Sequence, residues 1–276
     1  MVKAKRGLIF LTCLTSALSA IVCLLSFGTQ NWIEAKGTYG SLDGYNIITY
    51  GLFTGSFKRN VGSVSIHEIV MTCLISDNVC AMLCKSTSED RKWELQKLYN
   101  NDKVTFDTDC PQVFRSNYRP IPATRILRED VGGERTFISA ASFIFTAFFL
   151  IVSAVFGLAA AVLAVWNTAG NPIYTVFSIY GMQIYNIVGA VTVLLTIIVW
   201  GAEYNITIIS NACILETIIG DMSTIESNLG YSYWILFVPL VLYPTSAGIL
   251  YLRQYLINKE PEKQVDIQED GDIIMY

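Results

Sequence analysis

FISAASFIFTAFFLIVSAVFGLAAAVLAVW, residues 137 to 166, is a run of 30 residues without a single charge. A helix needs about 20 predominantly apolar residues to cross the hydrocarbon core of a bilayer, so this run is long enough to span one. Three further runs reach that length: Leu8 to Phe27, Phe177 to Trp200 and Tyr233 to Leu256. Apart from Arg253 near the end of the last run, they contain no Lys, Arg, Asp or Glu. The pattern predicts four transmembrane helices.

The composition of the whole chain agrees with this prediction. Hydrophobic residues make up 53% and charged residues 15% of the 276 residues, and the mean hydropathy is +0.45. A soluble domain of this size could not hide so much apolar surface in its interior. A secretory signal peptide is the alternative for the first run, but its apolar core is longer than the usual ~7–15 residues.

The charges that flank the spans predict their orientation. Lys3, Lys5 and Arg6 precede the first span without an acidic residue, which favours a cytosolic N-terminus. Four spans then return the C-terminus to the cytosol, and the expected location is the plasma membrane. The expected segments are an N-terminus at 1–7, spans at 8–28, 137–166, 177–200 and 233–256, extracellular loops at 29–136 and 201–232, a cytosolic loop at 167–176 and a cytosolic tail at 257–276.

The first extracellular loop is long enough to fold. YNIITYGLF, residues 45–53, has the composition of a β-strand. VSIHEIVMTCL, residues 64–74, and DRKWELQKLYN, residues 90–100, place apolar residues near helical spacing. We therefore expect an all-α membrane protein, an antiparallel four-helix bundle with a small extracellular β-sheet. The loop holds 13 basic and 13 acidic residues, so it has no net charge to attract nucleic acid.

Four cysteines of the first loop are disulfide candidates: Cys73, Cys80, Cys84 and Cys110. Exported loops meet an oxidising compartment, where disulfides persist, and four cysteines allow three pairings that the sequence leaves open. A zinc site is a poor alternative, because the chain has a single histidine and no paired CxxC. We expect no metal and no cofactor.

The spans carry packing signals. Gly157 and Ala161 stand four residues apart, which lets helices approach closely. Gln183 and Asn186 are expected to hydrogen-bond a neighbouring helix, and a pore-lining role is the alternative. Four further aromatic residues sit where membrane-interface side chains belong: Trp200, Trp234, Tyr251 and Tyr255.

The sequence contains no motif that is typical of a catalytic site. It lacks a GxSxG motif, a glycine-rich phosphate loop and any acidic residue within the spans. Glu203, just beyond the third span, is interpreted as a solvated interfacial carboxylate. We therefore expect that the protein is not an enzyme.

Two short motifs point to modification and binding. Asn205-Ile206-Thr207 is the only N-x-S/T glycosylation acceptor in the chain. The last residues, Ile274, Met275 and Tyr276, form a hydrophobic-x-hydrophobic ending that fits the groove of a PDZ domain, with the free carboxylate captured by backbone amides. The alternative is that these residues fold back onto the bilayer surface.

A family resemblance follows from the residues around the first span. Trp32 soon after that span, then Gly51-Leu52-Phe53, in a four-span chain with a large first loop, resembles the claudin-like superfamily. The combination of NWIEAK, YGLFTGS and the ending DGDIIMY is most similar to the clarins. Ser56 and the Asn60-Val61 pair stand where the two clarin cysteines would fall, which is a departure from the family pattern.

The resemblance implies a function in organising membranes. Leu52 or Phe53 would lie on a strand and pack against Trp32 just above the membrane. Clarins imply sensory-cell membranes, with roles in hearing and vision, and partners among membrane proteins and PDZ or actin-linked scaffolds, in addition to the lipid bilayer. An auxiliary subunit of a channel or receptor, a claudin-like cell–cell adhesion protein and association between copies of this chain remain open alternatives.

Overall fold

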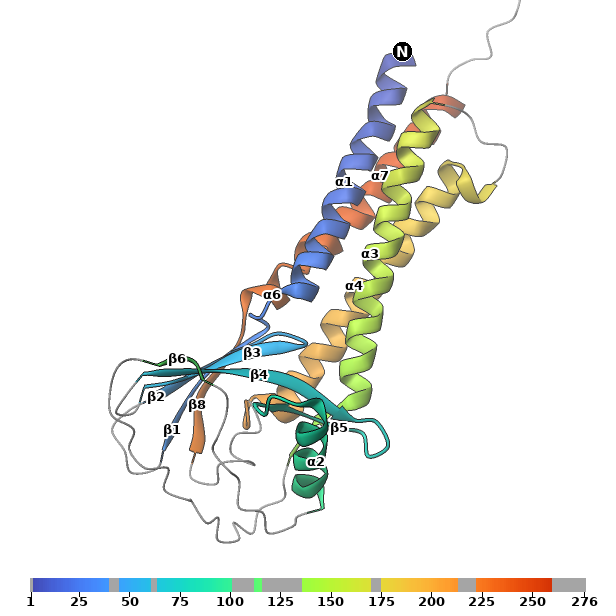
Figure 1. Ribbon diagram of the computed structural model, residues 1–276. Coiled ribbons are helices and arrows are strands. Elements are labelled where there is room, and N and C mark those ends of the chain that lie inside the picture. The colour runs from blue at the N-terminus through green and yellow to red at the C-terminus, as the bar shows by residue number, and fades with distance from the viewer. Residues whose placement is uncertain are drawn as a thin grey trace, which may run out of the picture.

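The computed structural model describes residues 2–39, 45–60, 64–100, 112–115, 136–169, 175–212 and 222–259. Four long helices form a bundle, and a β-sheet lies at one end of it (Figure 1). The helices are α1 (Val2–Gly28), α3 (Ala140–Ala169), α4 (Ile179–Glu203) and α7 (Phe237–Asn258). Each is long and apolar enough to cross a membrane. The prediction of four such helices is confirmed.

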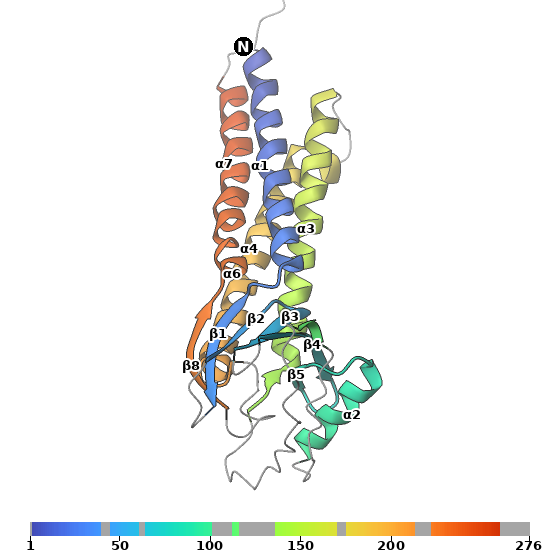
Figure 2. The ribbon, with the colours of Figure 1, turned by 60° about the vertical axis from the view of Figure 1, so that its left-hand side comes forward.

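Each helix of the bundle packs against two neighbouring helices. α1 packs against α3 and α7, and α4 packs against the same two helices, so α1 and α4 face each other diagonally. The turned view separates α7 and α1 on one side from α3 on the other (Figure 2). A short helix, α6 (Tyr231–Trp234), precedes α7, and a 3-10 turn, η1 (Thr175–Phe177), precedes α4.

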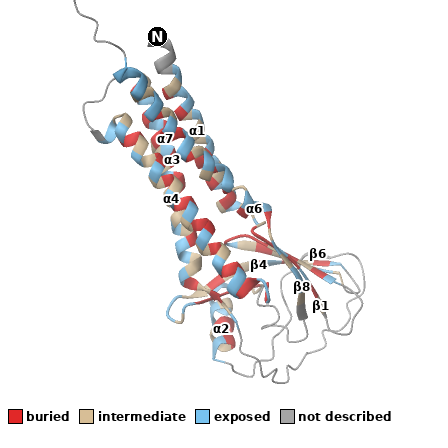
Figure 3. Cartoon of the chain, turned by 180° about the vertical axis from the view of Figure 1, so that it is seen from behind, coloured by how far each residue is buried: buried red, intermediate tan, exposed pale blue. Residues whose placement is uncertain are grey.

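The side chains of α1 are distributed opposite to those of a helix in a soluble protein. Its large apolar residues lie on the outer surface of the bundle: Phe10, Leu11, Leu14, Leu18, Ile21, Leu24 and Leu25. Its buried residues are mostly small or hydroxylated: Ile9, Thr12, Ser16, Ser19, Ala20, Cys23 and Ser26. The other three helices also expose large apolar residues along their length (Figure 3). Such surfaces are stable in lipid, where close packing of small residues associates helices.

Hydrogen bonds join the helices across the bundle interior. Ser16 of α1 donates to Asn186 Oδ1 of α4 at 2.8 Å, which confirms the prediction for Asn186. Tyr243 of α7 donates from its hydroxyl to the carbonyl of Ser153 on α3 at 2.8 Å. The Tyr243 ring needs the space left by Gly157, because a Cβ there would come within 2.3 Å of the hydroxyl oxygen. The small residues therefore serve close helix contact, as expected.

The sheet is larger than the sequence predicted. It has eight antiparallel strands, so an all-α fold with a small sheet is wrong for this end of the molecule. Seven strands follow the order β7-β5-β4-β3-β2-β1-β8, and β6 pairs with β4. The strands are β1 (Ile33–Tyr39), β2 (Tyr45–Tyr50), β3 (Thr54–Arg59), β4 (Ser65–Leu74), β5 (Val79–Leu83), β6 (Gln112–Arg115), β7 (Ile138–Ser139) and β8 (Met222–Leu229).

Two local predictions in the first loop are wrong. Residues 65–74 form strand β4 rather than a helix, because they pair with β3 on one side and β5 on the other and are rich in β-branched residues. Gly51-Leu52-Phe53 is not part of a strand but the turn between β2 and β3. The helical prediction for residues 90–100 is confirmed by α2 (Ser88–Tyr99), whose N-cap Thr87 accepts a hydrogen bond from the Asp90 amide.

The second loop completes the sheet. β8 pairs with β1, so the edge of the sheet comes from residues far along the chain. After Glu203, α4 continues as a π-helix, η2 (Tyr204–Ile208), and the buried Ile208 joins the core cluster under the sheet. The third apolar run is therefore longer in the structure than its sequence limits suggested.

Candidate functional site

The candidate site is the junction between the bundle and the sheet, which we define by Trp32, Gly51, Leu52, Phe53 and Gly230. Trp32 and Leu52 are fully buried and belong to one core cluster. The Trp32 indole donates from Nε1 to the Ser26 carbonyl at the end of α1, at 2.7 Å. The structure thus brings together the residues that carry the family resemblance.

Backbone hydrogen bonds connect Trp32 to residues from both loop segments that form the sheet, 29–136 and 201–232. Its amide donates to the Tyr50 carbonyl at 3.0 Å, and its carbonyl accepts from the Gly230 amide at 2.8 Å. A Cβ on Gly230 would lie 2.1 Å from the Asn31 carbonyl oxygen, and one on Gly51 would lie 2.1 Å from the Thr29 carbonyl oxygen. Only glycine permits these two close approaches.

Aromatic rings extend the junction to the other helices. Trp32 makes edge contacts with Trp200 of α4 at 5.4 Å and with Tyr233 of α6 at 6.3 Å between ring centroids. Phe53, which is 40% exposed, makes edge contacts with Phe27 of α1 at 4.8 Å and Phe143 of α3 at 5.9 Å. Of the two residues expected to pack near Trp32, Leu52 shares its buried cluster and Phe53 instead covers the helix ends.

Trp200 does not have the interfacial position expected from the sequence. It is fully buried against Trp32, and its Nε1 has no hydrogen-bond partner among the residues that the structure describes. Trp234, Tyr251 and Tyr255 are all more than half exposed, as interfacial aromatic residues should be.

A disulfide braces the sheet near the junction. Cys73 of β4 and Cys80 of β5 are directly opposite each other and are bonded. Cys84 is also disulfide-bonded. Cys110, the fourth candidate, lies outside the described residues. The prediction of at least one disulfide in this loop is confirmed.

Of the residues that depart from the clarin pattern, Ser56 and Asn60 are among the described residues, whereas Val61 lies outside them. Ser56 of β3 faces Glu68 of β4, whereas Asn60 lies just beyond the end of β3. The residue across from Ser56 is therefore a carboxylate. The observed disulfide joins the next pair of strands instead.

The sequence analysis predicted that Glu203 is a solvated carboxylate, and this prediction is wrong. It is buried, and its Oε1 accepts a hydrogen bond from the Ser139 amide at 2.9 Å, which ties the end of α4 to strand β7. Nearby Asn205 is exposed in the π-helix and donates to the Gly201 carbonyl at 2.7 Å. Thr207 of the same glycosylation motif is buried.

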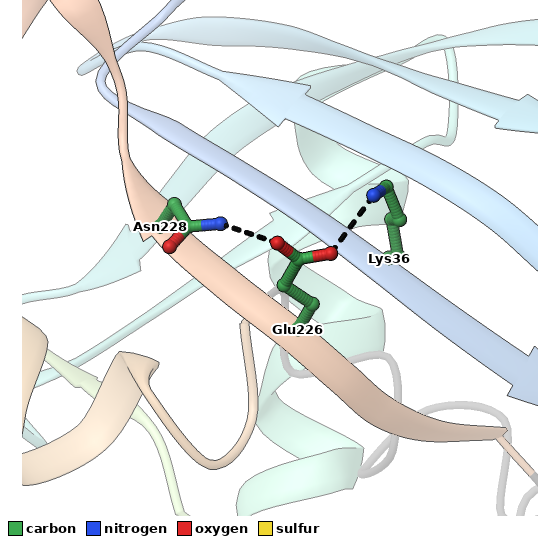
Figure 4. A network of polar contacts seen from close by, with 3 residues as sticks. All are labelled: Lys36, Glu226 and Asn228. Atoms are coloured by element: carbon green, nitrogen blue, oxygen red, sulfur yellow. Dashed lines mark hydrogen bonds and ion pairs between the residues drawn. The ribbon is translucent and has the colours of Figure 1, made fainter.

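A polar contact on the sheet surface also joins strands β1 and β8, which come from the two loop segments. Lys36 of β1 contacts Glu226 of β8 at 2.8 Å, and Asn228 donates to the other Glu226 oxygen at 3.0 Å (Figure 4). The hydrogen bond from Lys36 lowers the pKa of the Glu226 carboxyl, with Asn228 adding to the effect, and the same bond raises the pKa of Lys36. Both charged side chains are about half exposed, so this contact orients the strands more than it stabilises them.

The sequence analysis did not identify Glu94 of α2 as a buried carboxyl. It is buried, and its Oε2 has no hydrogen-bond partner within the described part of the chain. Burial raises the pKa of its carboxyl; Lys85 opposes this shift and Asp90 adds to it. The only signal in the sequence was its helical position beside Leu95 and Leu98, both of which are buried.

The junction residues fix two parts of the chain together through the hydrogen bonds of Trp32. Among the described residues, no three His, Cys, Asp or Glu side chains are placed to hold a metal ion. The candidate PDZ ligand, Ile274, Met275 and Tyr276, lies outside the described residues.

Comparison with known proteins does not assign the chain to a family. No protein-family model matches the chain, and no curated protein matches it. The junction must therefore be interpreted from its own geometry.

Proposed function

We propose that the chain is a non-enzymatic, four-span protein of the plasma membrane that organises other membrane proteins and links them to cytoskeletal scaffolds. The observation that carries this proposal is the junction, where Trp32 is hydrogen-bonded simultaneously to Ser26 at the end of α1, to Tyr50 at the end of β2 and to Gly230. A domain fixed in this way keeps one orientation relative to the bundle. An organiser needs this property, because it must present a binding surface at a constant height and angle.

Aromatic residues support placement of the bundle in a bilayer. Phe143 and Trp166 of α3 are 23 positions apart, about 35 Å at ~1.5 Å per residue. This separation fits a hydrocarbon core of about 30 Å with aromatic side chains at both interfaces. The exposed apolar surface between them would then face lipid.

The disulfide and the basic N-terminus support the proposed orientation. Cys73–Cys80 would form and persist outside the cell, and Lys3, Lys5 and Arg6 would remain in the cytosol. The tail would then also be cytosolic, where Tyr276 could enter a PDZ groove.

Membership of the claudin-like superfamily, as a divergent clarin, is part of the proposal. Its support is the meeting of Trp32 with the Gly51-Leu52-Phe53 turn at the end of the bundle. Sensory-cell membranes, and roles in hearing or vision, follow only from that resemblance. Ser56 and the Asn60-Val61 pair, which stand where the two clarin cysteines would fall, are the main departure from the family pattern.

The test is proteomic comparison of the full chain with a variant that lacks Ile274, Met275 and Tyr276, both isolated from native membranes after mild crosslinking. The proposal predicts PDZ and actin-linked proteins with the full chain and their loss with the truncated one. Enrichment of a channel pore subunit by both forms would instead support an auxiliary subunit. Recovery of proteins from apposed cells would support adhesion.

A further inference from the structure

Two segments that are far apart in the sequence meet at the end of the bundle away from the sheet. Helix α1 begins at this end and α7 ends there, and the two helices lie side by side (Figure 2). The hydroxyl oxygens of Thr15 in α1 and Ser246 in α7 are 2.5 Å apart. This contact gives the register of the two helices, because residues that precede Thr15 lie beside residues that follow Ser246.

The charged residues of these two segments are all basic. They form what we call the basic end of the bundle: Lys3, Lys5 and Arg6 in α1, Arg253 in α7 and Lys259 directly after it. Counted from Thr15 and Ser246 at ~1.5 Å per residue, all five lie about 10–20 Å beyond the contact. Residues 2–28 and 231–259 contain no Asp or Glu, so no acidic residue of either segment offsets these charges.

The other half of the bundle carries no such charge. The sequence from 137 to 202 contains neither basic nor acidic residues, and it includes all of α3, all but the last residue of α4 and the connection between them. The positive charge is therefore concentrated on the α1–α7 side. A positive-inside bias alone does not require this concentration, because basic residues in the connection between α3 and α4 would serve it equally well.

The basic end lies at the height of an interfacial tryptophan. The Tyr243 hydroxyl of α7 donates to the Ser153 carbonyl of α3, so these two residues lie at about the same height. Thirteen residues further along the two helices are Trp166, which is 64% exposed, and Leu256. Leu256 stands between the two basic residues of α7 and its end. In the membrane placement proposed above, the basic end is therefore among the lipid headgroups.

We propose that the basic end of α1 and α7 binds the headgroups of anionic phospholipids in the cytosolic leaflet. This inference rests on the membrane placement proposed above. Lipid is the occupant because headgroups surround the bundle at this height and because their negative charge complements a cluster without acidic residues. Each Lys or Arg near an anionic membrane surface strengthens binding about fivefold, so the two helices together bind more tightly than either alone.

The chain itself contains one competitor for these charges. Residues 260–276 directly follow Lys259 and contain six acidic residues and one lysine. Such a segment attracts the same basic residues as an anionic lipid does. The experiment must therefore separate lipid from the tail.

The test is native mass spectrometry of the full chain in detergent with equal amounts of phosphatidylserine and phosphatidylcholine. Detergent is used because the loss of N-terminal charges can change the orientation of a chain in a bilayer. We expect several-fold more bound phosphatidylserine than phosphatidylcholine. In the triple variant Lys3→Gln, Lys5→Gln and Arg6→Gln, this ratio should fall at least about threefold. The double variant Arg253→Gln and Lys259→Gln should lower it by a similar factor.

The matched control is the double variant Lys85→Gln and Lys97→Gln. These two lysines contact the Trp93 ring in the sheet domain, at the other end of the molecule, so their loss should leave the lipid ratio unchanged. A further variant ends at Lys259 and lacks the acidic tail. It should retain the preference for phosphatidylserine at the same level or a higher one.

Equal binding of the two lipids by the natural chain would overturn the inference and leave the membrane placement intact. Retention of neither lipid would contradict both. A ratio that falls in the triple variant but not in the double variant would show that α7 does not contribute, which overturns the shared site. A preference that appears only after removal of residues 260–276 would show that the tail occupies the basic end, which also overturns it. The helical circular dichroism spectrum confirms that each variant is folded.

Discussion

Helix α1 of the bundle and the sheet domain follow opposite packing rules within one chain. In α1, leucines and phenylalanines face outward, and serine, threonine and small residues face inward. In the sheet, large apolar residues such as Ile48, Tyr50 and Phe57 face inward, and Lys36 and Glu226 are exposed. The hydrophobic effect buries large apolar residues only where water is the solvent. The reversal indicates that the two regions are built for different solvents.

The difference also explains why the junction combines apolar packing with hydrogen bonds. At the boundary between the two regions, neither the burial of large apolar residues nor the close packing of small residues is sufficient alone. Trp32 contributes to both, because its ring packs in an apolar cluster while its Nε1 and its backbone make hydrogen bonds to Ser26 of α1, Tyr50 of β2 and Gly230. Substitutions that affect one region and not the other test this interpretation.

The largest effect is expected from Trp32→Ala. Loss of a fully buried tryptophan leaves a cavity and removes the hydrogen bond to Ser26, so the free energy of unfolding should fall by about 3–5 kcal/mol. The matched control is Trp93→Ala, since Trp93 is 53% exposed and should change stability by less than about 0.5 kcal/mol. Chemical unfolding in nanodiscs measures both. Equal effects would contradict the role of Trp32 at the junction.

Gly157→Ala tests the bundle interior. The added methyl group would collide with the Tyr243 hydroxyl, so we expect destabilisation of about 1–3 kcal/mol. Gly248→Ala is the control, because a Cβ there meets no atom within 4 Å and removal of a helical glycine favours the helix. If thermal unfolding shows that both variants are equally stable, close packing at Gly157 is not what holds α3 and α7 together.

Glu94→Gln gives a smaller effect that depends on pH. The pKa of the Glu94 carboxyl is raised in the folded protein above the value near 4.5 that holds in the unfolded chain. The free energy of unfolding therefore falls as the pH rises from 4.5 through the raised pKa, because the buried carboxyl must lose its proton. The variant should therefore unfold at a higher temperature than the natural chain at pH 7 and at the same temperature near pH 4. Glu89→Gln, at an exposed position of α2, is the control for the removal of a carboxyl group from this helix.

The smallest effect is expected from Lys36→Met. Its contact with Glu226 is exposed to solvent, so thermal unfolding should not change measurably at neutral pH. The pKa of Glu226 should nevertheless rise, because the Lys36 hydrogen bond that lowers it is gone. The contribution of the Lys36–Glu226 pair to the free energy of unfolding is small. It is present at neutral pH and is lost as the pH falls below 4.5 through the lowered pKa of Glu226. An NMR titration of the Glu226 carboxyl carbon checks the shift, and an unchanged pKa would contradict the contact.

The sequence predicted the bundle far better than the sheet. Long uncharged runs have few alternative structures, so four helices of membrane-spanning length could be recognised directly. Strand β4 was mistaken for a helix because its apolar spacing is ambiguous and its partners β3 and β5 decide its structure. β8 could not be assigned to the sheet from local sequence, because its partner β1 lies almost two hundred residues away along the chain.

The candidate site was predicted only in outline. The resemblance identified Trp32 and the Gly51-Leu52-Phe53 turn, but it gave no sign of Gly230, whose importance depends on a close approach to the Asn31 carbonyl. Glu203 and Trp200 were both placed in solvent or at the interface, because burial by a neighbouring element is invisible in the local sequence.

The most direct test of the reversed packing is a spin-label scan of α1 in lipid bilayers, in a background where Cys13 and Cys23 are replaced by alanine. The account predicts high accessibility to dissolved oxygen at Phe10, Leu14, Leu18 and Ile21, low accessibility at Thr12, Ser16 and Ser19, and little accessibility to a water-soluble nickel reagent at any of them. Uniform oxygen accessibility along the helix, or ready access of the nickel reagent to the leucine positions, would contradict it.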